Sequence, residues 1–146
     1  MIKSLEINER LEKYISDHSY DLHPVQKEIL QYNDTLGHSK KMQISISQAY
    51  FFQFFIKTNN IKNILEVGTF TGYSALSMGL VLPKDGKITC LDINKETTKV
   101  ASNFFKKARV LLSINNVQLK VNSYNQNKFL TSKKNLLLSV SLKKTI

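Results

Sequence analysis

The segment that most constrains the fold runs from Asn63 to Leu80 and reads NILEVGTFTGYSALSMGL. Its first five residues are apolar apart from Asn63 and one glutamate, and they stop at a glycine, which predicts a short buried strand. Gly68 and Gly72 then mark a tight turn, and residues 73–82 fit a helix. A strand that enters a helix through a glycine turn lets a ligand approach the backbone at the carboxyl edge of a sheet.

A second strand and helix follow directly. The turn PKDG spans Pro83–Gly86, the strand KITCLD spans Lys87–Asp92, and a helix begins at Asn94 or Lys95 and runs to Ala108. The order is therefore strand, helix, strand, helix. Such a unit is typical of a parallel sheet with right-handed crossovers, so we predict an α/β fold.

Three helices are expected before this unit. Ser4 precedes a helical stripe of apolar residues and is a candidate N-cap. Pro24 opens the second helix and Gly37 follows its end. A capping box at Ser45, with Gln48 three residues later, introduces a third helix, whose many aromatic residues predict burial on a wide face.

The chain divides into three parts within one predicted domain: helices in 1–60, the strand–helix unit in 61–108 and an atypical basic tail in 109–146. The net charge is +10, and the tail has seven lysines and arginines but no Asp, Glu, Gly or Pro. In the tail, residues 116–121 alternate as a third strand would, and the last 25 residues give no clear pattern. A basic tail can bind RNA through its phosphates, although this one lacks interleaved aromatic residues.

Other features bound the class of protein. A single cysteine, Cys90, excludes a disulfide framework within the chain and suits a reducing compartment. No apolar run is long enough for a membrane span, and the N-terminus lacks the apolar core of a secretion signal. We therefore expect a cytoplasmic protein with no membrane partner.

The turn predicts a ligand that is a nucleoside without phosphates. Asp92 lies 20 residues beyond Gly72, the interval at which an acid reaches the ribose hydroxyls of a bound nucleotide. Phe70 occupies the position of the middle glycine of a dinucleotide fingerprint, and its bulk would hinder a pyrophosphate. Glu66 could serve a cationic centre, directly or by holding the N–H groups of the loop. S-adenosylmethionine (SAM) combines a nucleoside, an ammonium and a sulfonium, and has no phosphate.

The stretch ILEVGTFTGYSALSMGLVLPKDGKITCLDIN resembles the cofactor half of small SAM-dependent O-methyltransferases of the caffeoyl-CoA and catechol type. The segment MQISISQAYFFQFFIK resembles the lead-in helix of that family. The similarity covers Lys40 to Ala108 and, more loosely, the two preceding helices. It implies a Rossmann-like methyltransferase fold, a parallel sheet with N-terminal helices, that is incomplete at the C-terminus.

The resemblance also implies a set of cofactor-binding residues. Glu66 would lie near the methionine part, Tyr73 and Ser74 would contact its amino-acid end, and Asp92 would hold the ribose. The full set is Ile44, Glu66, Gly68, Thr69, Gly72, Tyr73, Ser74 and Asp92.

Four of these residues have structural alternatives that the sequence leaves open. Glu66 could be a surface acid on an edge strand, and Asp92 could be only a neighbour of a helix N-cap. Ser74 could be an ordinary hydroxyl in the first turn of a helix, and Ile44 could serve packing alone.

The resemblance implies a methyl acceptor that is a small catechol-like hydroxyl compound, bound through a divalent cation such as Mg²⁺. In the family, acids after the fourth and fifth strands hold this cation, but no Asp or Glu follows Ala108 here. No catalytic residue is assigned, and no metal site is predicted.

We therefore expect that the gene product is truncated or frame-shifted after about residue 108 and is inactive. The alternatives are a tRNA hydroxyuridine methyltransferase of the same family, a basic RNA-binding module or a non-catalytic remnant; a homodimer also stays open.

Overall fold

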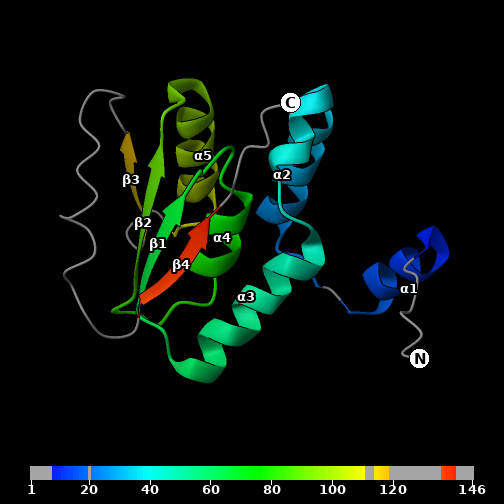
Figure 1. Ribbon diagram of the computed structural model, residues 1–146, viewed down its shortest axis with the longest axis horizontal. Helices are drawn as coiled ribbons and strands as arrows, with labels where there is room; N and C mark the ends of the chain where they lie inside the picture. The colour runs from blue at the N-terminus through cyan, green and yellow to red at the C-terminus, as the bar shows by residue number, and fades with distance from the viewer. Residues whose placement is uncertain (1–7, 20, 111–113, 119–135, 141–146) are drawn as a thin grey trace, which may run out of the picture.

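A computed structural model describes residues 8–19, 21–110, 114–118 and 136–140 (Figure 1). Its centre is a four-stranded parallel sheet in the order β3-β2-β1-β4. The strands are β1 (Asn63–Val67), β2 (Lys87–Asp92), β3 (Ile114–Gln118) and β4 (Leu136–Val140). The predicted α/β class is confirmed, and β1 and β2 have the predicted bounds.

Two strands lie in the part of the chain for which the sequence signals were weak. β3 begins at Ile114, two residues before the alternating stretch that predicted it. β4 was not predicted, because its sequence LLLSV has no alternation that separates a strand from a helical segment. It pairs with β1, with Glu66 opposite Ser139, which makes β1 an inner strand of the sheet.

The described helices that pack on the sheet lie on one of its faces (Figure 1). Ile64 and Ile88 are neighbours in register on this face and pack into a core with α4 (Tyr73–Gly79) and α5 (Lys95–Lys107). α4 is shorter than the predicted helix over residues 73–82, and α5 begins at Lys95 after its N-cap Asn94, the two residues at which the sequence predicted its start. Leu65 and Leu91 lie on the opposite face, where the described part of the chain contributes no helix.

The remaining helices precede the sheet. α2 (Pro24–Asp34) starts at the predicted proline, and a capping box between His23 and Gln26 fixes this start. A 3₁₀-helix, η1 (Gly37–Met42), joins α2 to the segment before α3 (Ile46–Asn59), and the predicted Ser45–Gln48 capping box of α3 is confirmed.

The first helix and the aromatic helix differ from their predictions. α1 (Glu9–Ser19) begins after Asn8, whose side chain accepts the N–H of Leu11 at 3.0 Å, and the predicted cap Ser4 lies outside the described residues. In α3 the predicted wide buried face is wrong. Its buried residues are Ala49 and Ile56, and three phenylalanines are exposed: Phe51, Phe54 and Phe55. The helix contacts α4 along a narrow stripe, so its aromatic content exceeded what the core could cover.

None of the helices in the described ranges combines the length and the apolar character that a membrane crossing requires.

We predict that the Gly72→Ala substitution strongly lowers the free energy of unfolding. Gly72 has φ +88°, and an added Cβ would lie 2.7 Å from the Phe105 ring and 2.9 Å from the Ala101 Cβ. Backbone strain and overpacking together should lower the free energy of unfolding by about 2 to 5 kcal/mol. Urea denaturation followed by circular dichroism measures this change.

Gly37→Ala is the matched control, because Gly37 also has positive φ, at +55°, but its Cβ would meet no atom within 4 Å. This variant should lose only about 1 to 2 kcal/mol through backbone strain. Equal losses for the two variants would show that the contact with Phe105 is unimportant.

Candidate cofactor site

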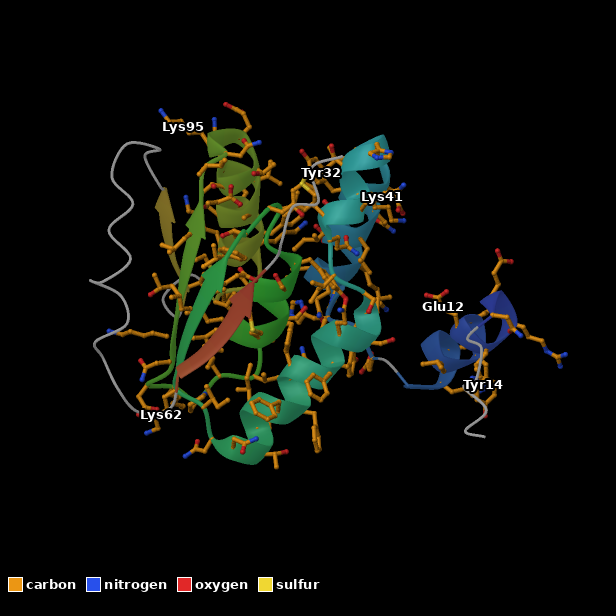
Figure 2. All side chains as sticks on the ribbon, in the orientation of Figure 1. Glu12, Tyr14, Tyr32, Lys41, Lys62 and Lys95 are labelled. Atoms are coloured by element: carbon orange, nitrogen blue, oxygen red, sulfur yellow. The ribbon has the colours of Figure 1, made fainter. Side chains whose placement is uncertain are left out.

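A small cleft opens at the carboxyl edge of the sheet, between the turn after β1 and the segment that joins η1 to α3. Five predicted residues meet there with three others: the lining is Met42, Gln43, Ile44, Gly68, Thr69, Phe70, Tyr73 and Ser74. In Figure 2 the label Lys95, at the start of α5, lies at this carboxyl edge of the sheet. The label Lys62, just before β1, lies at the opposite edge. The carboxyl edge is the edge at which open α/β sheets bind ligands.

The turn between β1 and α4 depends on three left-handed residues. Gly68, Phe70 and Gly72 have φ values of +93°, +52° and +88°. Glycine adopts this conformation at little cost, whereas Phe70 is strained by it. The chain reverses within a few residues as a result, and the backbone of Gly68 reaches the cleft with no side chain in front of it.

Gly72 has a packing role that the sequence did not predict. We predicted that it leaves room for a ligand, but the space that its side chain would fill holds Phe105 and Ala101 of α5. The absence of a side chain allows α5 to pack closely against the turn. Contact between Gly72 and a cofactor stays a prediction.

Asp92 ties the two loops of this edge together. Its Oδ2 accepts the N–H of Phe70 at 2.7 Å, and its Oδ1 accepts the N–H of Asn94 at 2.9 Å. The first bond holds Phe70 in its strained conformation, and the N-cap of α5 is Asn94 itself. Each carboxylate oxygen still has a second lone pair, so the predicted role toward ribose hydroxyls remains chemically available.

Glu66 is buried at the end of an inner strand, with 1% of its surface exposed. The alternative of a surface acid on an edge strand is therefore wrong. Its Oε1 shares a short hydrogen bond with the hydroxyl of Ser74, which lines the cleft, so Ser74 is more than an ordinary first-turn hydroxyl. Glu66 itself does not line the cleft; it acts on it from behind through Ser74.

Burial raises the pKa of Glu66 from 4.5 to about 7. Hydrogen bonds from Ser74 and Cys90 oppose this rise, and the negative charge of Asp92 adds to it. Cys90 on β2 is likewise buried, and burial raises the pKa of its thiol.

Several buried polar atoms around the turn lack strong partners. Among the described residues, Glu66 Oε2 and the hydroxyls of Thr69 and Thr71 have no hydrogen bond of ordinary geometry. Unsatisfied buried polar atoms are costly, and in native proteins they gather at functional sites. Their presence beside the cleft fits a polar ligand such as the amino-acid end of SAM.

Sequence reasoning did not find the residues that shape the other wall. Gln43 lines the cleft beside Ile44, and its Oε1 accepts the side-chain N–H of buried Asn33 in α2 at 2.6 Å. This hydrogen bond joins residues that are ten positions apart in the sequence, and no local motif predicts it. Ile44 packs against the core and also lines the cleft, and its contact with a cofactor stays a prediction.

No group of three or more His, Cys, Asp or Glu side chains gathers as a metal site within the described ranges. The part of 109–146 outside β3 and β4, to which the RNA-binding alternative refers, lies mostly beyond the described residues.

Comparison with known proteins identifies relatives of this chain. The sequence model of the O-methyltransferase family matches residues 16–133, which is more than half of the chain. The match extends past Ala108, where the similarity stated from the sequence ended. A protein from Arabidopsis thaliana, provisionally named a caffeoyl-CoA O-methyltransferase, is 36% identical over 118 residues, covering 77% of this chain and 50% of the relative. The caffeoyl-CoA O-methyltransferase of Zinnia elegans is 44% identical over 69 residues, 47% of this chain and 28% of that enzyme.

The chain thus spans about half the length of the Arabidopsis relative. Among solved structures, an SAH-bound methyltransferase from Podospora anserina matches with a TM-score of 0.80 at 22% identity, covering 97% of this chain and 62% of that protein. At this identity the likeness establishes the fold, and the Rossmann-like methyltransferase fold is confirmed.

We predict that Glu66→Gln removes a pH-dependent loss of stability. A carboxyl whose pKa is raised by folding stabilises the fold fully below its unfolded value of 4.5, and this stabilisation is lost as the pH rises toward about 7. Gln is isosteric and uncharged. The variant should therefore gain about 2 to 3 kcal/mol relative to the natural protein between pH 5 and pH 8.

Denaturant unfolding of both proteins at the two pH values measures this difference. The other titratable groups are common to both proteins, so they cancel in the comparison. A stability difference that does not change with pH would contradict the assignment.

Proposed function

We propose, since this chain belongs to the O-methyltransferase family, that its cleft binds SAM and its product S-adenosylhomocysteine (SAH). The observation that supports this most directly is the gathering of Ile44, Gly68, Thr69, Tyr73 and Ser74 around one cleft. These residues come from two segments more than 20 positions apart, and the family resemblance had assigned all five to the cofactor.

Each part of the site suits one part of this ligand. Gly68 offers bare backbone, and the Ser74 hydroxyl offers a hydrogen bond to the amino-acid end. Asp92, across the turn, has free lone pairs for the two hydroxyls of a ribose. Phe70 lines the cleft where a dinucleotide would need space for its pyrophosphate, and SAM has no pyrophosphate.

The proposed reaction of the family domain is methyl transfer to a hydroxyl of a small catechol-like acceptor. When bound, SAM supplies an electrophilic methyl group on its sulfonium. A bond forms between the acceptor oxygen and the methyl carbon as the carbon–sulfur bond breaks, and the products are SAH, the methyl ether and a proton. The described residues position the methyl donor in this scheme, and we assign none of them as a base.

The cation that this reaction calls for does not fit the residues present. Mg²⁺ prefers carboxylate oxygens in octahedral geometry, and residues 109–146 contain no Asp or Glu. We therefore propose that this chain binds the cofactor without methylating a catechol, and we derive no step through a cation. Acceptance of tRNA, RNA binding by the basic tail, a homodimer and a cytoplasmic location stay predictions from the sequence.

The first test is isothermal titration with SAH. We predict saturable binding, weakened about tenfold or more by Ser74→Ala, because the hydrogen bond to a charged end of the ligand is lost. Thr58→Ala is the control, since this exposed hydroxyl lies at the far end of α3 and should leave the affinity unchanged. Absence of binding by a folded chain would refute the proposal.

The second test addresses turnover. With SAM, Mg²⁺ and a catechol, we predict no methylated product above the level obtained without protein, because residues 109–146 contain no carboxylate to hold the cation. Mass spectrometry of the acceptor detects the methyl group. Catalytic turnover in this assay would show that the cation finds other ligands or is not needed.

A further inference from the structure

The hydrogen bond between Glu66 and Ser74 can run in two directions. An ionised Glu66 can only accept, so it takes the hydroxyl hydrogen of Ser74 and leaves the Ser74 oxygen as an acceptor toward the cleft. A protonated Glu66 donates to the Ser74 oxygen instead. The Ser74 hydroxyl hydrogen is then free to point into the cleft. The charge of Glu66 therefore decides whether the cleft offers a donor or an acceptor at this position.

The surroundings of Glu66 favour the protonated form. The side chain is 1% exposed, and its Oε2 has no hydrogen bond of ordinary geometry to a described residue. No described cation acts on it; the titratable groups that do are Cys90 and Asp92, both on β2. A carboxylate buried in this way, with an acid nearby and no positive partner, is costly unless it takes up a proton.

We propose that Glu66 is protonated when the cleft is occupied, so that Ser74 donates its hydroxyl hydrogen to the carboxylate of the ligand and cofactor binding takes up a proton. This proposal rests on the proposed function, because it assumes that the ligand is SAM or SAH. It makes Glu66 a positioning residue that acts through Ser74, and it differs from the direct contact with a cationic centre that the sequence suggested.

The proton balance is simple. Above neutral pH the empty site holds Glu66 as a carboxylate, and one proton from the solvent binds to it when the ligand enters. That proton lies between Glu66 and the Ser74 oxygen, and the hydrogen already on Ser74 turns toward the ligand. If Glu66 stayed ionised, it would keep the hydroxyl hydrogen of Ser74. The carboxylate of the ligand would then face the Ser74 oxygen, which is also an acceptor, with no hydrogen between them.

The test is the dissociation constant of SAH between pH 6 and pH 8.5, measured by titration calorimetry. For the natural protein we expect the dissociation constant of SAH to rise about thirtyfold across this range. The reason is that Glu66, whose pKa in the empty site is about 7, must gain a proton when SAH binds. Calorimetry in buffers with different ionisation heats should show uptake of close to one proton at pH 8.5. The amino group of SAH titrates equally with every variant, so it cancels in the comparison.

Glu66→Gln is the decisive variant, because its amide donates to Ser74 at every pH. Its constant for SAH should be independent of pH, apart from the titration of the ligand, and at pH 8.5 it should bind more tightly than the natural protein. Asp85→Asn is the matched control. Asp85 is an exposed acid that pairs with Lys62 at 2.6 Å, at the opposite edge of the sheet (Figure 2), so this variant should keep the natural pH profile.

Two results would overturn the inference while leaving the proposed function intact. One is SAH binding by the natural protein that shows no pH dependence and no proton uptake. The other is loss of SAH binding by a folded Glu66→Gln variant at all pH values, which would mean that the negative charge of Glu66 is needed. If neither protein binds SAH at any pH, the proposed function fails and this inference fails with it.

Discussion

The parallel pairing of β1 with β2 is the constraint on which the site depends. The two strands are aligned from Asn63 opposite Lys87 to Val67 opposite Leu91, so both end at the same edge of the sheet. Gly68 extends this pairing by donating its N–H to Leu91 O at 2.8 Å. The loops that follow the strands are thereby brought together, and Asp92 can reach the backbone of Phe70. Without this register the residues of the turn would not face a common cleft.

Within that frame, the two acids of the edge act through other residues. Asp92 holds the strained backbone of Phe70, and Glu66 holds the hydroxyl of Ser74. Each acid therefore shapes the cleft in addition to any contact that it makes with a ligand. Substitutions at these positions report on the arrangement of the turn as well as on recognition, which is why the neutral and isosteric change of Glu66 is more informative than its removal.

Local features of the structure could be predicted from the sequence, and contacts between distant segments could not. The strand NILEV, the glycine turn, the capping box at Ser45 and the start of α5 at Asn94 or Lys95 are encoded by neighbouring residues, and all four are confirmed. The family resemblance likewise indicated five residues that line the cleft. By contrast, Gln43 is held in the wall of the cleft by a hydrogen bond from Asn33. Position 72 must be glycine because a side chain there would collide with Phe105. Neither requirement has a signal in the adjacent sequence, because each depends on how helices pack.

The position of β4 bears on how the chain is made. Helices α2 to α5 and strands β1 and β2 all come from residues 24–107, so this face of the fold can assemble from contacts between near neighbours in the sequence. β4 pairs with β1 although it is encoded far downstream, at residues 136–140. During synthesis β1 therefore keeps one edge unpaired until the ribosome has added β4. An unpaired strand edge is a template for pairing with other chains, so the strand that holds Glu66 also exposes the nascent chain to misassembly until β4 pairs with it.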